Sequence, residues 1–384
     1  MSEEATVPGA ETDATKALRA ATPSPEPAPV GSAWTGGQWS FVRAVVGAGT
    51  IVRIVESAFA NPTGNATSIT VAALGVVAAI ALTLGAWTRV AAVALLALQW
   101  KTTPSWLVYN TVRDLPLLAF VLAPAAPFGS FAARGRVDPD GGWRLPAFVF
   151  KLSWYCIGLL ALVHVVRPFL LERHATVGEI LIAVSGALFV ALAPFPKTRP
   201  IAWIQHFVAN ALLFAFLTLG EDWIDVDMSL AVLSTFLLLF DPSWFPPQRA
   251  AAPELVFFDG HCGLCHRLVR FVLAEDREGL FLFSTLQGEK IQTVLDEATR
   301  ARLPDSVVVQ DSQGRVLVKS AAVVHVYERL GGIWRVVALL LGVIPTALRD
   351  FGYDFIAKVR HQVFARPAES CPLMPPRLKD RFVA

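Results

Sequence analysis

The chain has 384 residues, of which 54% are hydrophobic and 17% charged. Its mean hydropathy of +0.52 is too apolar for a soluble protein and predicts an integral membrane protein. A net charge of +2 without a long basic run argues against a nucleic-acid partner. Four cysteines are too few and too scattered for a secreted disulfide framework: Cys156, Cys262, Cys265 and Cys371.

Residues 1–33 are predicted to form a disordered tail, because proline, alanine, glutamate and threonine dominate and little apolar surface is available for burial. A cleaved signal peptide needs a basic start with an apolar stretch close behind it. Here the first apolar run begins only near Phe41, so we expect the tail to be retained.

Residues 34–247 contain long apolar stretches with short polar interruptions, which is typical of a transmembrane bundle with about 20 residues per crossing. We predict about eight membrane-spanning helices: 39–59, 69–87, 90–109, 115–131, 147–166, 177–195, 201–219 and 226–245. Prolines within the third and fourth stretches predict kinks or re-entrant turns. An even count places both termini on the same side.

Basic residues near the helix ends predict that side. One set of segments carries Lys16, Arg19, Arg89, Arg134, Arg136, Arg144, Lys197, Arg199 and Arg249. The opposite set carries only Lys101, Arg113, Arg167 and Arg173. We therefore expect a bacterial cytoplasmic (inner) membrane protein with cytoplasmic N- and C-termini.

Several polar side chains fall inside the predicted bundle, where each costs free energy unless it has a partner. The candidates for a ligand-binding cavity are Arg43, Arg53, Asn110, Asp114 and His206. Hydrogen bonds that hold helices together are the alternative explanation for each of them. As a group they suggest a quinone-like or lipid ligand, and no other cofactor is required.

Proline and arginine around Pro242, Pro246, Pro247, Arg249 and Pro253 mark a linker, placed at 248–254. It precedes a second domain at 255–384, where short alternating elements replace the long apolar stretches. The pattern predicts strands at 255–258, 280–284, 306–310 and 316–319, with helices at 262–274, 291–302 and 321–330. The order βαβαββα is that of a thioredoxin-like α/β fold. The predicted fold class is thus a multi-pass helical bundle followed by a thioredoxin-like domain.

The second domain contains the one close cysteine pair, Cys262-Gly-Leu-Cys265, between the first strand and the first helix. A helix start stabilises a thiolate, so Cys262 would attack a disulfide and Cys265 would resolve the mixed disulfide. Asp259 is a candidate proton relay, although a turn residue is the more ordinary role at this position. His261 and His266 flank the pair and would either favour the thiolate or remain exposed polar residues.

Other chemistries fit the same cysteines less well. The motif C-x-x-C-H also attaches c-type haem, but that requires the outer side of the membrane. A metal site would need further ligands, and the chain has no second C-x-x-C. A structural pair of small buried residues is the third alternative. Cys156, in an apolar helix, and Cys371, in a proline-rich tail, are assigned no catalytic role.

The sequence FDGHCGLC resembles the D-x-x-C-x-x-C signature of the DCC (DUF393-type) thiol-disulfide oxidoreductase family. The likeness covers 255–384 and includes Asp305-Ser306, Ser320-Ala321, Ile344-Pro345, Arg349 and Tyr353. It implies a thioredoxin-like fold and a redox role for the cysteine pair. It does not name a substrate.

Residues 34–247 resemble the HTTM domain, the membrane fold of vitamin K-dependent gamma-carboxylase. The likeness rests on WTRV (87–90), Asn110, Asp114, PFGSF (127–131), Trp154-Tyr155, His206 and LLLFDPSWFP (237–246). The carboxylase has a lysine shortly after the tyrosine that corresponds to Tyr155, whereas this chain has CIGLLALVHVV, with His164 as its ionisable group. Carboxylase activity is therefore not implied.

The segment WRVVALLLGVIP (334–345) is too short to span a bilayer and is expected to pack on the domain core or a membrane face. The basic residues that follow it are expected to meet anionic headgroups: Arg349, Lys358, Arg360 and Arg366.

Together these features predict a membrane-bound thiol-disulfide oxidoreductase whose partners are the lipid bilayer and a protein disulfide client or cytoplasmic reductant. The alternative is a non-enzymatic membrane receptor or scaffold whose thioredoxin-like domain binds a protein.

Overall fold

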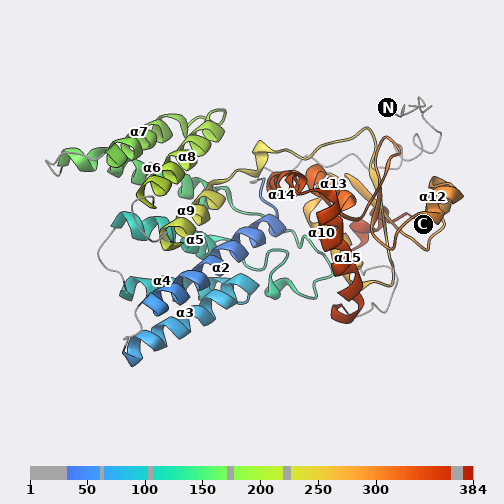
Figure 1. Cartoon of the computed structure of the whole chain (residues 1–384), viewed down its shortest axis with the longest axis horizontal. Helices are drawn as coiled ribbons and strands as arrows, with labels where there is room; N and C mark the ends of the chain where they lie inside the picture. The colour runs from blue at the N-terminus through green and yellow to red at the C-terminus, as the bar shows by residue number, and fades with distance from the viewer. Residues whose placement is uncertain are drawn as a thin grey trace. The chain divides into compact units, whose positions relative to one another are not determined.

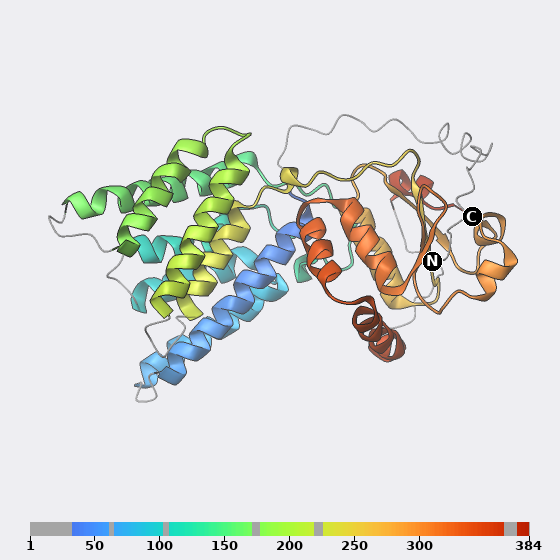
Figure 2. The ribbon, with the colours of Figure 1, turned by 45° about the horizontal axis from the view of Figure 1, so that its top comes forward.

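The computed structural model describes residues 33–60, 65–102, 107–170, 177–218, 226–364 and 375–383. The chain divides into a helical unit, Gly31–Trp244, and a second unit that contains Phe245–Ala384. Cys371, Arg366 and the predicted N-terminal tail up to residue 32 lie outside the described residues. The two units are drawn in Figures 1 and 2 and are taken one at a time.

The helical unit forms helices where the sequence has its apolar stretches. They are α2 (Gly36–Ala60), α3 (Ala66–Leu84), α4 (Thr88–Thr102), α5 (Leu107–Leu122), α6 (Ala147–Leu170), α7 (Val177–Leu192), α8 (Arg199–Thr218) and α9 (Val226–Leu239). Helix α2 packs on α3 and α9, and α7 packs on both α6 and α8. The prediction of a largely helical N-terminal region is confirmed.

Fewer of these helices than predicted have the length and composition to cross a bilayer. Among the described residues, α3 alone qualifies, and a bent helix pair in the second unit raises the number of candidates to two. Helices α4, α5, α7 and α9 have 14 to 16 residues, or about 21–24 Å, against a hydrocarbon core of about 30 Å. The fourth predicted span, 115–131, fails because α5 ends at Leu122, before Pro124.

Aromatic side chains fill the interior of the helical unit. Trp39 contacts Trp34 and Phe120 edge to face, with ring centroids 5.5 and 5.2 Å apart. Trp154 stacks on Phe189 at 5.2 Å. Many large aliphatic side chains on α2, α3, α4, α7 and α8 instead point outward and are exposed, including Val52, Leu74, Val77, Val90, Val93, Leu181 and Leu212. An aqueous surface rarely carries so much apolar area.

The second unit is built on a four-stranded mixed sheet in the order β2-β1-β3-β4. Its strands are β1 (Glu254–Phe258), β2 (Phe281–Thr285), β3 (Val308–Gln310) and β4 (Val316–Val318). Strands β1 and β2 are parallel, whereas β3 is antiparallel to both β1 and β4. The predicted order βαβαββα is confirmed, with α10 (Gly263–Glu275) after β1 and α13 (Lys319–Leu330) after β4.

The predicted helix at 291–302 is wrong in one respect, because two short helices replace it. Helix α11 (Lys290–Val294) ends before Asp296, whose extended backbone starts α12 (Glu297–Ala301). The Asp296 carboxylate accepts a hydrogen bond from the Thr299 amide at 2.8 Å. Capping by an aspartate thus stops one helix and starts the next.

Two further helices follow the thioredoxin-like core, α14 (Gly332–Val343) and α15 (Thr346–Val363). They meet at a bend of 113°, and Figure 2 shows α15 turning sharply away from α14. A short 3-10 helix, η3 (Pro376–Arg381), ends the described chain beside β2.

The sheet register determines where a site can form. Strand β1 is buried along its whole length, and Phe257 pairs with Val308 of β3. Because the two strands are antiparallel, the residues after Phe258 lie beside those before Val308. The segment 259–265 and the loop 305–307 therefore share one edge of the sheet.

Candidate functional site

The cysteine pair lies at this edge, where β1 ends and α10 begins. Cys262 is the N-cap residue of α10, and its amide donates to the Asp259 carbonyl at 3.2 Å. Cys265 lies one turn further along the helix. Both are thiols in this structure. Cys262 is only 1% exposed, whereas Cys265 is partly exposed.

Asp259 holds the turn that precedes the first cysteine. One of its carboxylate oxygens accepts from the His261 amide at 2.9 Å and from the Gln287 side chain at 3.2 Å. Gln287 also accepts a hydrogen bond from the Gly260 amide at 3.3 Å. These contacts fix the turn geometry. The proton-relay role of Asp259 stays a prediction.

The two histidines beside the pair have different surroundings. His261 is exposed, whereas His266 is buried, with Nε2 2.9 Å from the Gly260 carbonyl oxygen. The His266 ring also meets Phe258 edge to face at 5.9 Å. A haem attached at C-x-x-C-H would use that ring nitrogen as a ligand, so the observed contact does not favour haem attachment.

Helix α15 places a buried arginine, Arg360, at the same edge of the sheet. Arg360 is 4% exposed, and its guanidinium donates to both carboxylate oxygens of Asp305 at 2.6 Å and to the Asp305 carbonyl at 3.3 Å. About two turns nearer the start of α15, the Tyr353 hydroxyl accepts a hydrogen bond from the Val307 amide at 3.0 Å. Helix α15 thus holds the loop 305–307 beside the thiols.

The charge of Arg360 acts on both cysteines. Burial raises the pKa of the Cys265 thiol well above its ordinary value, the hydrogen bond that this thiol donates to Cys262 raises it further, and Arg360 opposes both effects. Burial would lower the pKa of Arg360, but Asp305 and the two thiols raise it overall. The guanidinium is therefore a fixed positive charge for a thiolate formed at this site.

This role of Arg360 differs from the sequence-based prediction, in which the residue meets lipid headgroups. That assignment is wrong, because the side chain is buried and ion-paired. Arg360 follows Cys265 by 95 positions, so no local motif links them. One residue could have pointed to this role of Arg360. Asp305 is among the residues of the family resemblance, and its carboxylate is the partner of Arg360.

The candidate residues of the helical unit have separate partners. Arg43 is buried and donates to Ser40 Oγ at 3.1 Å and to the Gly129 carbonyl at 3.2 Å. His206 Nδ1 lies 2.9 Å from Ser185 Oγ on α7. Arg53 and Asp114 are half-buried. Asn110 belongs to α5, and its side chain lies outside the described residues.

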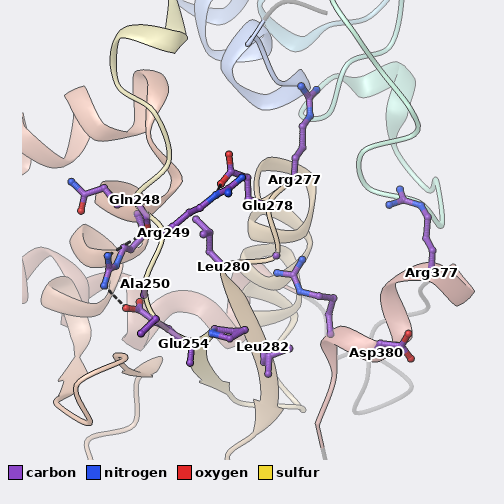
Figure 3. A pocket seen from close by; sticks show the side chains of 16 residues that line it. Gln248, Arg249, Ala250, Glu254, Arg277, Glu278, Leu280, Leu282, Arg377 and Asp380 are labelled. Atoms are coloured by element: carbon purple, nitrogen blue, oxygen red, sulfur yellow. Dashed lines mark hydrogen bonds and ion pairs between the residues drawn. The ribbon is translucent and has the colours of Figure 1, made fainter. Parts of the chain in front are cut away.

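A pocket of about 360 Å³ lies at the opposite end of β1, around Glu254 (Figure 3). Arginines line it, and carboxylates hold several of them: Arg249 pairs with Glu278 at 2.6 Å, and Arg329 pairs with Glu254 at 2.6 Å. Burial would raise the pKa of Glu254, but His325 and Arg329 together lower it. The pocket therefore contains a structural ion-pair network and no part of the thiol site.

Comparisons with known proteins agree with this geometry. The family described as DCC1-like thiol-disulfide oxidoreductase matches residues 256–366. The chain is 37% identical over 132 residues to the uncharacterized protein YuxK of Bacillus subtilis, covering 34% of this chain and 93% of YuxK. It is 34% identical over 119 residues to a chloroplastic DCC family protein of Arabidopsis thaliana, covering 31% of this chain and 69% of that protein.

No solved structure gives a significant match. The family match includes both cysteines, the loop 305–307 and Arg360, and it lies wholly within the second unit. Through this domain, the chain belongs to the DCC1-like thiol-disulfide oxidoreductase family.

Proposed function

We propose that the chain is a membrane-bound thiol-disulfide oxidoreductase that uses Cys262 and Cys265 as a cycling dithiol. The observation that carries the proposal is the placement of Cys262 at the start of α10, one turn from Cys265 and beside the ion-paired Arg360. Free N–H groups at a helix start and a nearby guanidinium both stabilise a thiolate.

In the reducing direction, the Cys262 thiolate attacks one sulfur of a client disulfide. A mixed disulfide forms, and the client's other sulfur leaves as a thiolate that takes up a proton. Cys265 then loses its proton and attacks Cys262 Sγ, which forms the internal disulfide and releases the second client thiol. Two electrons pass from the dithiol to the client, and a cytoplasmic dithiol reductant restores the pair by the reverse exchange.

The raised pKa of Cys265 fits the second step, because a resolving thiol that stays protonated does not compete with Cys262 for the client. The burial of Cys262 favours the alternative of a non-enzymatic scaffold, since an attacking sulfur must be reachable. Alkylation separates the two. A catalytic Cys262 reacts faster at neutral pH than a free cysteine, and a scaffold cysteine does not.

Trapping the client is the direct test. A Cys265→Ser chain expressed in bacterial cells should accumulate a mixed disulfide through Cys262, visible as a reducible adduct whose attached protein is then identified. The double variant Cys262→Ser, Cys265→Ser is the matched control and should carry no adduct. If the single variant also carries none and the purified chain reduces no disulfide, the oxidoreductase proposal fails.

The finer parts of the proposal concern the helical unit. We propose that it has the HTTM fold in a bacterial cytoplasmic membrane, with both termini in the cytoplasm, and that it holds a quinone-like or lipid ligand. The exposed aliphatic side chains of α3 and the buried Arg43 support this. Mass spectrometry of molecules extracted from the purified chain, compared with an Arg43→Leu chain, tests the ligand.

A further inference from the structure

Helix α15 has the polarity of a membrane-facing helix and not that of a helix on a soluble domain. Four of its polar residues, Asp350, Tyr353, Asp354 and Arg360, bind groups of the domain. Asp350 accepts from the Ser320 amide at 3.3 Å, and Asp354 accepts from Lys319 Nζ at 2.8 Å. Tyr353 and Arg360, on the same side, hold the loop beside the cysteines.

The large apolar residues of this helix face outward, as do those at the end of α14. Eight of them are between 51% and 83% exposed: Leu339, Leu340, Val343, Leu348, Phe351, Phe355, Ile356 and Val363. We call these eight side chains the apolar hairpin face. A soluble domain normally buries such a stripe, and a contiguous exposed patch marks a binding surface.

The geometry of the hairpin suits a surface position. Helix α14 has 12 residues, or about 18 Å, which is short of the roughly 30 Å of a hydrocarbon core. Together, α14 and α15 are long and apolar enough to cross a bilayer, but the pair is bent by 113°. A bent, short, amphipathic pair lies in the membrane interface and does not cross it.

The start of the hairpin is attached to the segment that directly follows the helical unit in sequence. The Gly332 amide, at the start of α14, donates to the Phe245 carbonyl at 2.6 Å, and the Arg335 guanidinium lies over the Phe245 ring at 5.9 Å. Phe245 directly follows Trp244, the last residue of the helical unit that contains α3. Lys358 is exposed among the apolar residues of α15, where it suits anionic headgroups.

We propose that the apolar hairpin face inserts into the interface of the lipid bilayer, so that α15 holds the dithiol at the membrane surface. Its polar side contacts the loop 305–307, so the thiols lie within roughly one helix diameter, about 10–12 Å, of the lipid. This inference rests on the proposed exchange chemistry. A dithiol held at the membrane surface would act on one class of substrate, disulfides at or in the membrane.

The test uses spin labels on the full chain in nanodiscs of phosphatidylcholine and phosphatidylglycerol. The four native cysteines are replaced by serine, and a single label is attached at Phe351→Cys or Leu340→Cys. Gln313→Cys, exposed in the β3–β4 turn, is the matched control. Labels on the face should collide more with oxygen than with a water-soluble nickel complex, and the control label should show the reverse preference.

Nickel-accessible labels at both face positions would overturn the proposal, as would labels shielded from both reagents, which indicate a protein cover. Such a cover is a second copy of the chain if dilution releases it and the helical unit if dilution does not. The two proposals fail separately. If the labels contact lipid but no client is trapped, the membrane insertion stands and the exchange proposal fails. If a client is trapped but the labels are accessible to nickel, the exchange proposal stands and the insertion fails.

Discussion

Gly331 is the position where one added methyl group should damage the second unit most. Its backbone has φ +71° and ψ −163°, a conformation that only glycine adopts readily. An added Cβ would lie 2.5 Å from the Phe245 carbonyl oxygen, 2.7 Å from Pro247 N and 2.8 Å from Pro246 C. All three are backbone atoms, so no side-chain rotation relieves the clash.

The expected loss for Gly331→Ala follows from these contacts. The backbone conformation costs about 1–3 kcal/mol, the overpacking about 1–3 kcal/mol, and loss of the Gly332–Phe245 hydrogen bond about 1 kcal/mol. The sum is about 3–7 kcal/mol, a large part of the roughly 5–15 kcal/mol that stabilises a domain. The linker attachment at the start of α14 should loosen first.

Hydrogen exchange of the β1 and β2 amides in the full chain measures this loss as a free energy of opening. Gly314→Ala is the control, because Gly314 also has a positive φ of +82° but no atom within 4 Å of an added Cβ. That variant should lose only about 1–2 kcal/mol. If the two variants lose the same amount, the close backbone approach at Gly331 has no energetic weight and the reasoning is refuted.

Three further predictions concern the site and its support. Arg360→Gln should slow alkylation of Cys262 at neutral pH by roughly two- to ten-fold, because a positive charge beside the thiols is lost, whereas Lys358→Gln should not; equal rates would remove Arg360 from the mechanism. In a Cys262→Ser chain, Cys265 should alkylate slowly at neutral pH and faster as the pH rises past 9.0, because burial raises its pKa and favours the protonated thiol; fast modification at pH 7 would contradict this. Asp276→Ala removes a fully buried carboxylate that binds an arginine and two backbone amides, so urea unfolding should show a loss of about 3–5 kcal/mol, and a loss under 1 kcal/mol would show that the network is dispensable.

Much of the second unit could be predicted from local pattern. Strand β1 is a short apolar run followed by Asp259-Gly260, and both features act within a few residues. The break at Asp296 was missed because an aspartate inside a helical pattern is ordinary until its side chain caps the next helix. In the helical unit, apolar content predicted where helices form. Whether a helix is long enough to cross a bilayer depends on where it ends, and the ends depend on capping residues and prolines.

The site was predictable only where its residues are neighbours in sequence. One short motif contains the turn at Asp259 and the two cysteines. Its position between a predicted strand and a predicted helix was enough to place Cys262 at the helix start. Arg360 and Tyr353 come to the thiols through contacts between α15 and the loop 305–307. Such contacts join residues about 50 positions apart, and a periodic pattern carries no information about them.

The polarity of α15 shows why periodicity alone misleads. Leu348, Phe351, Phe355 and Val363 recur at helical spacing, which identifies an apolar stripe without saying what covers it. The opposite side of the helix determines its orientation, because buried Arg360 needs the Asp305 carboxylate as its partner. An unpaired buried charge costs several kcal/mol, about as much as burying one or two large apolar side chains gains. Because the polar side already has its partners in the domain, the apolar stripe is left exposed, and we propose that lipid covers it.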